Sequence, residues 1–273
     1  MRAIISSAGT AVLTDVPRPS PGQGEVLVRV KANSLNRADL MTLKDGTHGA
    51  FGASGFPIGL EWAGEVLDVG AGVEDWRVGD RAMAAGQTVL IQGASSAMGV
   101  MGMQVAKHLG AAMVIGTSMS PERRARLAEF GADVVVDTGT PDWVAQVLSA
   151  TGGEGVDLLI DLVAGPLVNG SLQATRIGGC MVNVGRMAEE RGEFDFDLHS
   201  LRRITYVGVT FRTRSPQEVE EVVTRAARAL GPALEQRALR MPIDKVYRLE
   251  EIVAAFEHMA RNKHFGKIVL THA

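Results

Sequence analysis

The sequence predicts an α/β protein in which a doubly wound parallel sheet is joined to a second, smaller and β-rich domain. From about Gln87 to Leu239, short apolar segments alternate with amphipathic ones over short links, as in right-handed βαβ crossovers. Residues 1–84 instead carry short strand-like runs separated by Gly, Pro and Asp. We therefore expect domains over 1–86 and 87–239, and a tail over 240–273 that returns to the first domain.

In the small domain, residues 1–16 alternate as a strand does, and EVLVRVKA (25–32) and WAGEVLDVG (62–70) predict further strands. In the tail, IVAAFEHMARNK (252–263) predicts a helix and GKIVL (266–270) predicts a strand. In the large domain we expect six strands, at 88–92, 111–117, 134–138, 157–163, 180–185 and 203–211. Helix-like segments follow them, after the first strand and at 121–132, 141–152, 165–179 and 215–231.

A tight turn of small residues separates the first strand of the large domain from its helix. Unpaired N–H groups and the helix dipole make such a turn a site for a pyrophosphate. Aligned to G-x-G-x-x-G, the turn has Ala94, Ser96 and Gly99, so only the third glycine, which allows close helix–strand packing, is present. The alternative is an ordinary buried strand–turn–helix without a ligand. The predicted cofactor contacts here are Ala94, Ser95, Ser96, Ala97, Met98 and Gly99.

The residues after the second strand of the sheet predict which dinucleotide binds. An NAD-preferring site usually places Asp or Glu there, whereas this chain has Thr117 and Ser118, followed by Arg123 and Arg124. Ser118 with one of the arginines would bind a 2′-phosphate through charge-assisted hydrogen bonds, so we expect NADPH, with Thr117, Ser118 and Arg123 as contacts. Residues 120–122 also read as the capped start of a helix, and both interpretations can hold together.

Composition excludes several function classes. With 46% hydrophobic and 22% charged residues the chain can bury a core, and a net charge of −3 without a basic run gives no attraction to nucleic acid or anionic membranes. The single cysteine, Cys180, excludes an intramolecular disulfide and a multi-cysteine zinc lobe. Residues 82–106 lack charge over a length that could span a bilayer, but Gly, Gln and Ser interrupt them. We therefore expect a soluble, cytoplasmic protein.

The small-residue turn is also similar to that of short-chain dehydrogenases, which need a Tyr-x-x-x-Lys pair. The two tyrosines, Tyr206 and Tyr247, are followed four residues on by Thr210 and Glu251. This class is therefore excluded.

Several strings, spread in order over nearly the whole chain, resemble the medium-chain dehydrogenase/reductase superfamily in its zinc-independent quinone oxidoreductase branch. They are SLNRADLM (34–41), GLEWAGEVLDVGAGV (59–73), VGDRAMA (78–84), GVTFRTRS (208–215) and GKIVL (266–270). The resemblance implies a GroES-like domain beside a Rossmann domain, a homodimer, and hydride transfer from NADPH to a quinone or an α,β-unsaturated carbonyl. Zinc-dependent relatives have ligands near Arg37 and at Leu60, so the resemblance implies no metal.

The chain departs from the family at one point. Some tens of residues that family members carry are missing between Ala84 and Gly86, so the small domain is abbreviated. An alternative function is therefore a catalytically weak or inactive NADPH-binding protein with a redox-sensing or interaction role.

The resemblance also implies which residues act on the substrate. Asn36, Asp39 and His48 are the catalytic candidates, with Asn36 donating through its amide and His48 in place of a tyrosine. For Asn36 the alternative is a turn cap, for Asp39 the acceptance of backbone hydrogen bonds or the orientation of Asn36, and for His48 a solvated loop. Phe51 and Phe56 would face a flat substrate or belong to the core. Three residues after the fifth strand would line the nicotinamide side: Asn183, Gly185 and Arg186.

Overall fold

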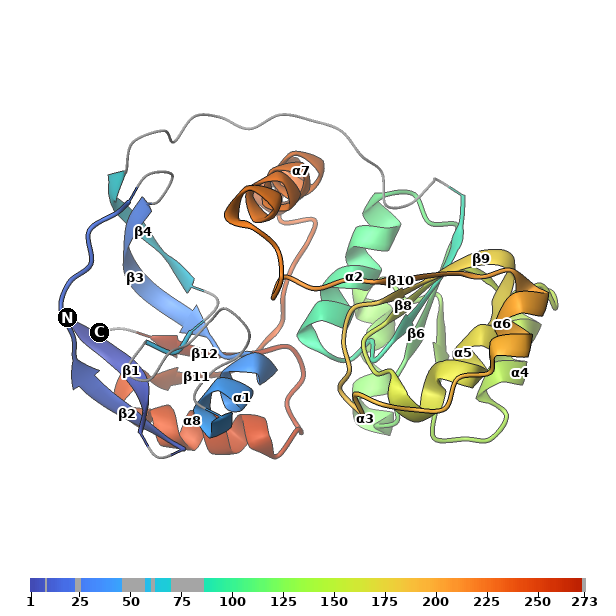
Figure 1. Cartoon of the computed structure of the whole chain (residues 1–273), viewed down its shortest axis with the longest axis horizontal. Helices are drawn as coiled ribbons and strands as arrows, with labels where there is room; N and C mark the ends of the chain where they lie inside the picture. The colour runs from blue at the N-terminus through green and yellow to red at the C-terminus, as the bar shows by residue number, and fades with distance from the viewer. Residues whose placement is uncertain (8, 23–25, 46–56, 60–61, 70–85, 272–273) are drawn as a thin grey trace. The chain divides into compact units, whose positions relative to one another are not determined.

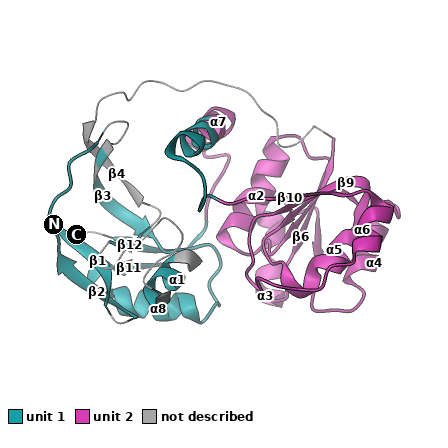
Figure 2. Ribbon diagram, in the orientation of Figure 1, with its two compact units in different colours: residues 1–77, 211–224, 242–273 teal, residues 78–210, 225–241 magenta. Residues whose placement is uncertain are grey.

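The computed structural model describes residues 1–7, 9–22, 26–45, 57–59, 62–69 and 86–271 (Figure 1). The chain forms two compact units, which Figure 2 shows in different colours. The division falls within helix α7 (Pro216–Glu235), whose two halves belong to different units. The first unit comprises residues 1–77, 211–224 and 242–273, and the second comprises 78–210 and 225–241.

The second unit contains the predicted parallel sheet. Its six strands lie in the order β10-β9-β8-β5-β6-β7, and every pair is parallel. The chain starts at the centre with β5, moves outward one way and then returns past β5 to build the other half, which confirms a doubly wound fold. The strands are β5 (Thr88–Gln92), β6 (Met113–Thr117), β7 (Val134–Val136), β8 (Val156–Asp161), β9 (Thr175–Asn183) and β10 (Thr205–Gly208).

Helices cover both faces of this sheet (Figure 1). Helix α2 (Ala97–His108) packs on β5 and β6 on one face, and α4, α5 and α6 form a layer on the other. The bounds of that layer are α4 Trp143–Ala150, α5 Val168–Ala174 and α6 Phe196–Arg202, with the 3₁₀ helix η2 at Gly165–Leu167. Because both faces are covered, the central strands each contribute a fully buried apolar residue: Leu90, Ile115, Leu159 and Met181.

The predicted helix over 121–132 is wrong in its extent. The segment forms a short helix α3 (Pro121–Arg124) and then the 3₁₀ helix η1 (Leu127–Phe130). A 3₁₀ turn places residues three apart on the same side, so Leu127 and Phe130 are both buried. The predicted helix-like segment at 165–179 is also wrong in its extent, because α5 ends at Ala174, β9 begins at Thr175 and its pairing with β8 shifts register there.

The first unit is β-rich, as expected. Strands β1 (Arg2–Ser7) and β2 (Thr10–Asp15) form an antiparallel hairpin. A second sheet has the order β11-β12-β3-β4, with β3 antiparallel to both of its neighbours and β11 parallel to β12. Its elements and the helices beside it are β3 Val26–Ser34, β4 Trp62–Val69, β11 Ile243–Arg248, β12 Lys267–Thr271, α1 Arg37–Asp45, η3 Leu249–Glu251 and α8 Ile252–Ala260.

The helix and strand of the tail are confirmed as α8 and β12, but β11 was not anticipated. Most of its side chains are exposed and only Tyr247 is buried, so the strand lacks a clear apolar alternation. The core of this unit is built from β1, the end of β3, α8 and β12, through Ile4, Leu35, Phe256, Ile268 and Leu270. No helix in the described part of the chain is long and apolar enough to cross a membrane.

Candidate functional site

The carboxyl edge of the parallel sheet carries a buried polar residue at the end of each of four neighbouring strands. They are Gln92 on β5, Thr117 on β6, Asp161 on β8 and Asn183 on β9, each at most 8% exposed. Carboxyl ends of parallel strands meet at one edge, and β5 and β8 flank the point where the strand order reverses. Open α/β sheets bind ligands at such a point.

The turn after β5 is built to bring the start of α2 close to the sheet. Gly93 has a φ of +72°, which favours glycine, and its amide bonds to the hydroxyl of Thr117 at 3.0 Å. The hydroxyl of Ser96 caps the helix by accepting from the amide of Gly99 at 3.1 Å. A Cβ on Gly99 would lie 2.5 Å from the Cα of Ala94, so the predicted close packing at this glycine is observed. Sequence reasoning missed Gly93, although a glycine directly after an apolar strand was a usable signal.

The amides of Ala97 and Met98 lie in the first turn of α2, where an α-helix supplies no internal acceptor. The side chain of Met98 is 62% exposed at the same place. A helix of this length with an exposed first turn can hold a phosphate through its amides and dipole.

The end of β6 lies directly beside this turn. The hydroxyl of Thr117 donates to the amide oxygen of Gln92 at 2.8 Å, and the amide of Ala94 donates to the carbonyl of Thr117 at 2.9 Å. The hydroxyl of Ser118 is within 3.0 Å of that of Ser95, and Ser118 is buried. Ser118 therefore ties the two turns together, in addition to any role toward a cofactor.

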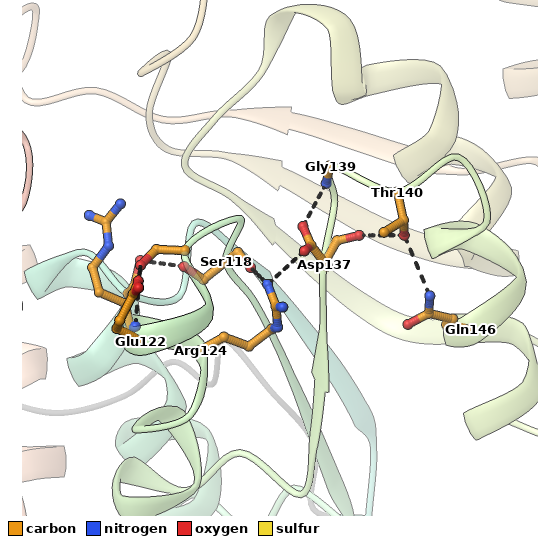
Figure 3. A network of polar contacts seen from close by, with 10 residues as sticks. Ser118, Glu122, Arg124, Asp137, Gly139, Thr140 and Gln146 are labelled. Atoms are coloured by element: carbon orange, nitrogen blue, oxygen red, sulfur yellow. Dashed lines mark hydrogen bonds and ion pairs between the residues drawn. The ribbon is translucent and has the colours of Figure 1, made fainter.

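Figure 3 shows where Arg124 lies. Its guanidinium donates to the carbonyl of Ser118 at 2.6 Å and pairs with the carboxylate of Asp137 at 2.8 Å. Asp137 follows β7, the next strand of the sheet, and was not among the predicted contacts. The charge of Arg124 is thus partly neutralised, which leaves Arg123 as the better candidate for a 2′-phosphate.

The predicted start of helix α3 is confirmed. Ser120 is its N-cap, with the hydroxyl accepting from the amide of Arg123 at 3.3 Å, and Pro121 is the first helical residue. Hydrogen bonds from its own backbone amide and from the hydroxyl of Ser120, together with the charge of Arg123, lower the pKa of Glu122. The helix-start interpretation of residues 120–122 is therefore confirmed, and the contact of Arg123 with a 2′-phosphate stays a prediction.

The ends of β8 and β9 are tied by backbone contacts. The carbonyl of Asp161 accepts from the amides of Val184 and Gly185, at 2.8 and 3.1 Å. One carboxylate oxygen of Asp161 accepts from the amides of Val163 and Ala164, both at 2.9 Å. The other, Oδ2, is buried and meets no hydrogen-bond donor among the described residues. A buried acceptor at this edge fits a ligand that brings donors, such as ribose hydroxyls or a nicotinamide amide.

Asn183, Gly185 and Arg186 form one local group after β9. Arg186 donates to the amide oxygen of Asn183 at 2.8 Å, and the Asn183 amide nitrogen donates to the carbonyl of Gly185 at 3.2 Å. A Cβ on Gly185 would lie 2.7 Å from the carbonyl oxygen of Leu162. Nearby, burial and the charge of Asp161 raise the pKa of Tyr206, and Arg186 opposes them.

In the first unit, Asn36 and Asp39 meet at the start of α1. The amide of Asn36 donates to the carboxylate of Asp39 at 2.6 Å, and the amide of Asp39 donates to the carbonyl of Asn36 at 2.9 Å. Asp39 is buried and accepts a backbone hydrogen bond, as its alternative interpretation expected. The amide oxygen of Asn36 accepts from Lys267 at 2.7 Å, a contact that sequence reasoning missed. His48, Phe51, Phe56 and Leu60 lie outside the described residues, as does the junction at Ala84.

Two family models match the chain. The model described as "Alcohol dehydrogenase GroES-like domain" matches residues 22–120, and the one described as "Zinc-binding dehydrogenase" matches residues 97–228. The chain belongs to the medium-chain dehydrogenase/reductase superfamily. Its second unit has the parallel sheet of a Rossmann fold, and residues 22–120 match the GroES-like domain of the superfamily. No three His, Cys, Asp or Glu residues of the described ranges are grouped so that they could hold a metal ion.

Solved structures of similar fold cover nearly the whole chain. A mycobacterial quinone oxidoreductase has a TM-score of 0.81 at 23% identity, covering 100% of both chains. The JamJ enoyl reductase has a TM-score of 0.81 at 20% identity, covering 99% of this chain and 98% of its own. A mycobacterial protein complexed with NADPH has a TM-score of 0.78 at 23% identity and covers 100% of both chains.

Among characterised sequences, a "Mycocerosic acid synthase-like polyketide synthase" of Mycolicibacterium smegmatis is 26% identical over 99% of this chain. The chain spans only 15% of the length of that protein. The alignment runs over 331 positions, more than the 273 residues of this chain, so the relative carries residues that have no counterpart here. This agrees with the missing segment inferred from the motifs.

Proposed function

We propose that the chain is a zinc-independent, NADPH-dependent oxidoreductase that transfers a hydride to a quinone or to an α,β-unsaturated carbonyl. The observation that carries the proposal is the carboxyl edge of the sheet. There the first turn of α2 offers backbone amides and Arg123 in α3 offers a cation. Oδ2 of Asp161 is an acceptor that meets no donor among the described residues. The amides fit a pyrophosphate, and the cation fits a ribose that carries a phosphate. The acceptor fits the hydrogen-bond donors of a nicotinamide ring.

Each part of the dinucleotide has candidate contacts in this chain. The amides of Ala97 and Met98 would hold the pyrophosphate, and Arg123 would bind the 2′-phosphate. Asp161 and the group around Asn183 would hold the nicotinamide side. When bound, NADPH supplies a hydride, and the protein binds, orients and excludes water.

The substrate side of the proposal rests on Asn36. Adding a hydride to the β-carbon of an enone places negative charge on the carbonyl oxygen, and a proton from water or a side chain completes the reduction. The charge needs a hydrogen-bond donor in a site without a metal. Asn36 would supply its amide N–H, and Asp39 would hold the backbone of Asn36. His48, Phe51 and Phe56 remain proposed contacts from the family resemblance.

Zinc independence is supported by the sequence positions where zinc-dependent relatives hold ligands. Arg37 and Leu60 stand there, and neither binds Zn²⁺. The same resemblance is our reason to expect a cytoplasmic homodimer, which size-exclusion chromatography with light scattering would test for its oligomeric part.

The direct test is steady-state oxidation of NADPH with a simple para-quinone, an ortho-quinone and a short 2-enoyl thioester. Turnover with any of them that falls at least tenfold in Asn36→Ala supports the proposal. Tight binding of NADPH without turnover of any acceptor would contradict it. That second outcome favours a cofactor-binding protein without catalysis, which the residues missing relative to the polyketide synthase make a specific alternative.

A further inference from the structure

We propose that Lys267 is the positioning residue for Asn36: it binds the amide oxygen of Asn36 and thereby presents the amide nitrogen as a hydrogen-bond donor. The inference deepens the proposed function and rests on it for the substrate. Lys267 is the second residue of the string GKIVL (266–270), and no role was predicted for it from the sequence.

The contact between the two side chains is short and partly buried. The ammonium nitrogen of Lys267 lies 2.7 Å from the Oδ1 of Asn36, and Lys267 is 9% exposed. A lysine ammonium has three donors and no acceptor, so it can bind the oxygen of the amide but not its nitrogen. The contact therefore decides which end of the amide faces Lys267, and the two N–H donors point to the other side.

The backbone places these residues opposite each other. In the antiparallel ladder of β12 with β3, Val269 pairs with Ser34 and Leu270 with Asn33. The amide of Leu35 donates to the carbonyl of Ile268 at 3.1 Å, which continues the same register by one step. One further step brings Lys267 opposite Asn36.

Lys267 is also held from its other side. Its amide donates to the carbonyl of Pro242 at 2.9 Å, next to its pairing with Ile243 on β11. The preceding residue, Gly266, has a φ of +92°, and a Cβ there would lie 2.1 Å from the carbonyl oxygen of Pro242. Lys267 is thus fixed between two strands, which limits the positions that its ammonium group can reach.

The two neighbours of Asn36 have separate tasks. Asp39 holds its backbone amide at 2.6 Å, and Lys267 holds its side-chain oxygen at 2.7 Å. A cation on the oxygen of an amide also polarises the amide and strengthens its N–H groups as donors. Lys267 therefore both orients and strengthens the donor that would stabilise negative charge on the substrate.

An NMR comparison tests the contact independently of turnover. The chain has five asparagines, so isotope labelling of asparagine gives five side-chain amide signals, and Asn36→Ala assigns one of them to Asn36. Lys267→Met should shift the Asn36 signal, whereas the exposed control Lys263→Met should leave it unchanged. An Asn36 signal that is the same in wild type and Lys267→Met would overturn the proposal.

Kinetics test whether the presented donor matters. Lys267→Met should lower kcat by about tenfold to 10²-fold and leave the Kd for NADPH unchanged, with partial rescue in Lys267→Arg. Asn36→Asp keeps a partner for Lys267 but removes the N–H donors, so it should fold and still lose kcat as Asn36→Ala does.

Adding Lys267→Met to Asn36→Ala should cause no further loss, because one residue acts through the other. Full activity of Asn36→Asp, or independent losses in the double variant, would overturn the positioning role. A wild-type chain that turns over no acceptor would instead refute the proposed function, and the NMR comparison would still decide the contact.

Discussion

Gly99→Ala tests the dinucleotide turn most directly. The new Cβ would lie 2.5 Å from the Cα of Ala94 and 2.6 Å from the carbonyl oxygen of Gly93. Carbon atoms in contact prefer about 3.5–4.0 Å, so helix α2 and the turn must separate by about 1 Å. Overpacking of this kind costs about 1–3 kcal/mol, and the better helix propensity of alanine returns about 1 kcal/mol of it. We expect a net loss of about 0–2 kcal/mol in the free energy of unfolding.

Gly102→Ala is the matched control on the same helix. Its Cβ would meet only the end of the Ile91 side chain, at 3.1 Å, which can rotate aside. The gain in helix propensity is the same for both variants, so the difference between them isolates the contact with the turn. We expect Gly102→Ala to change the free energy of unfolding by no more than about 1 kcal/mol in either direction.

Urea denaturation followed by circular dichroism gives the two stabilities, and NADPH fluorescence titration gives the two affinities. Because the separation moves the amides of Ala97 and Met98, the Kd of Gly99→Ala should rise by about tenfold, which corresponds to about 1.4 kcal/mol. The reasoning is refuted if both variants unfold at the same urea concentration and bind NADPH with the same Kd.

Three further predictions address the cofactor, stability and metal. Arg123→Ala should raise the Kd for NADPH roughly tenfold and leave that for NADH unchanged, and an equal loss for both would remove the 2′-phosphate role. Burial alone would raise the pKa of Asp157, but hydrogen bonds from the amide and hydroxyl of Thr88 and the charge of Arg176 outweigh it and lower the pKa. The stability that Asp157 contributes is thus complete above its unfolded pKa and lost as the pH falls through the lower folded value. Asp157→Asn should therefore flatten the acid side of a plot of urea midpoint against pH, and an unchanged acid side would contradict this. Dialysis against EDTA should leave the oxidation of NADPH by a quinone unchanged, whereas a loss restored by Zn²⁺ would show a metal site.

The nucleotide half was predictable because its signals are local. Each central strand is a short apolar run, since both of its faces are covered, and its end is marked by a polar residue such as Thr117 or Asp161. The capped turn at Ser96 and the packing of Gly99 also involve neighbours within a few residues. Strand β11 was not predicted, because its mostly exposed side chains give no periodic pattern of apolar residues.

The side-chain partners were not predictable for a different reason. Arg124 meets Asp137 only because β6 and β7 are adjacent in the sheet, and Asn36 meets Lys267 across 231 residues of sequence. Such contacts depend on strand register, which a residue pattern does not specify. The family resemblance identified Asn36 and Asp39 as candidates but gave no reason to single out Lys267.

The segment missing between Ala84 and Gly86 should have little effect on cofactor binding or on the contact of Asn36 with Lys267. The cofactor candidates described above lie between Gly93 and Arg186, and the contact of Asn36 with Lys267 is made within the sheet of β3 and β12. Neither group contains residues from the junction at Ala84. The family resemblance implies that the missing residues help to wall the active site. We expect their contacts with a substrate to lie away from the reacting atoms, where contacts supply binding energy that serves catalysis. We therefore expect NADPH binding to be unaffected by the deletion. Reduction of small quinones should persist, whereas enoyl substrates with long chains should gain little in kcat/KM over short ones; a steep rise with chain length would show that the chain closes its site by another route.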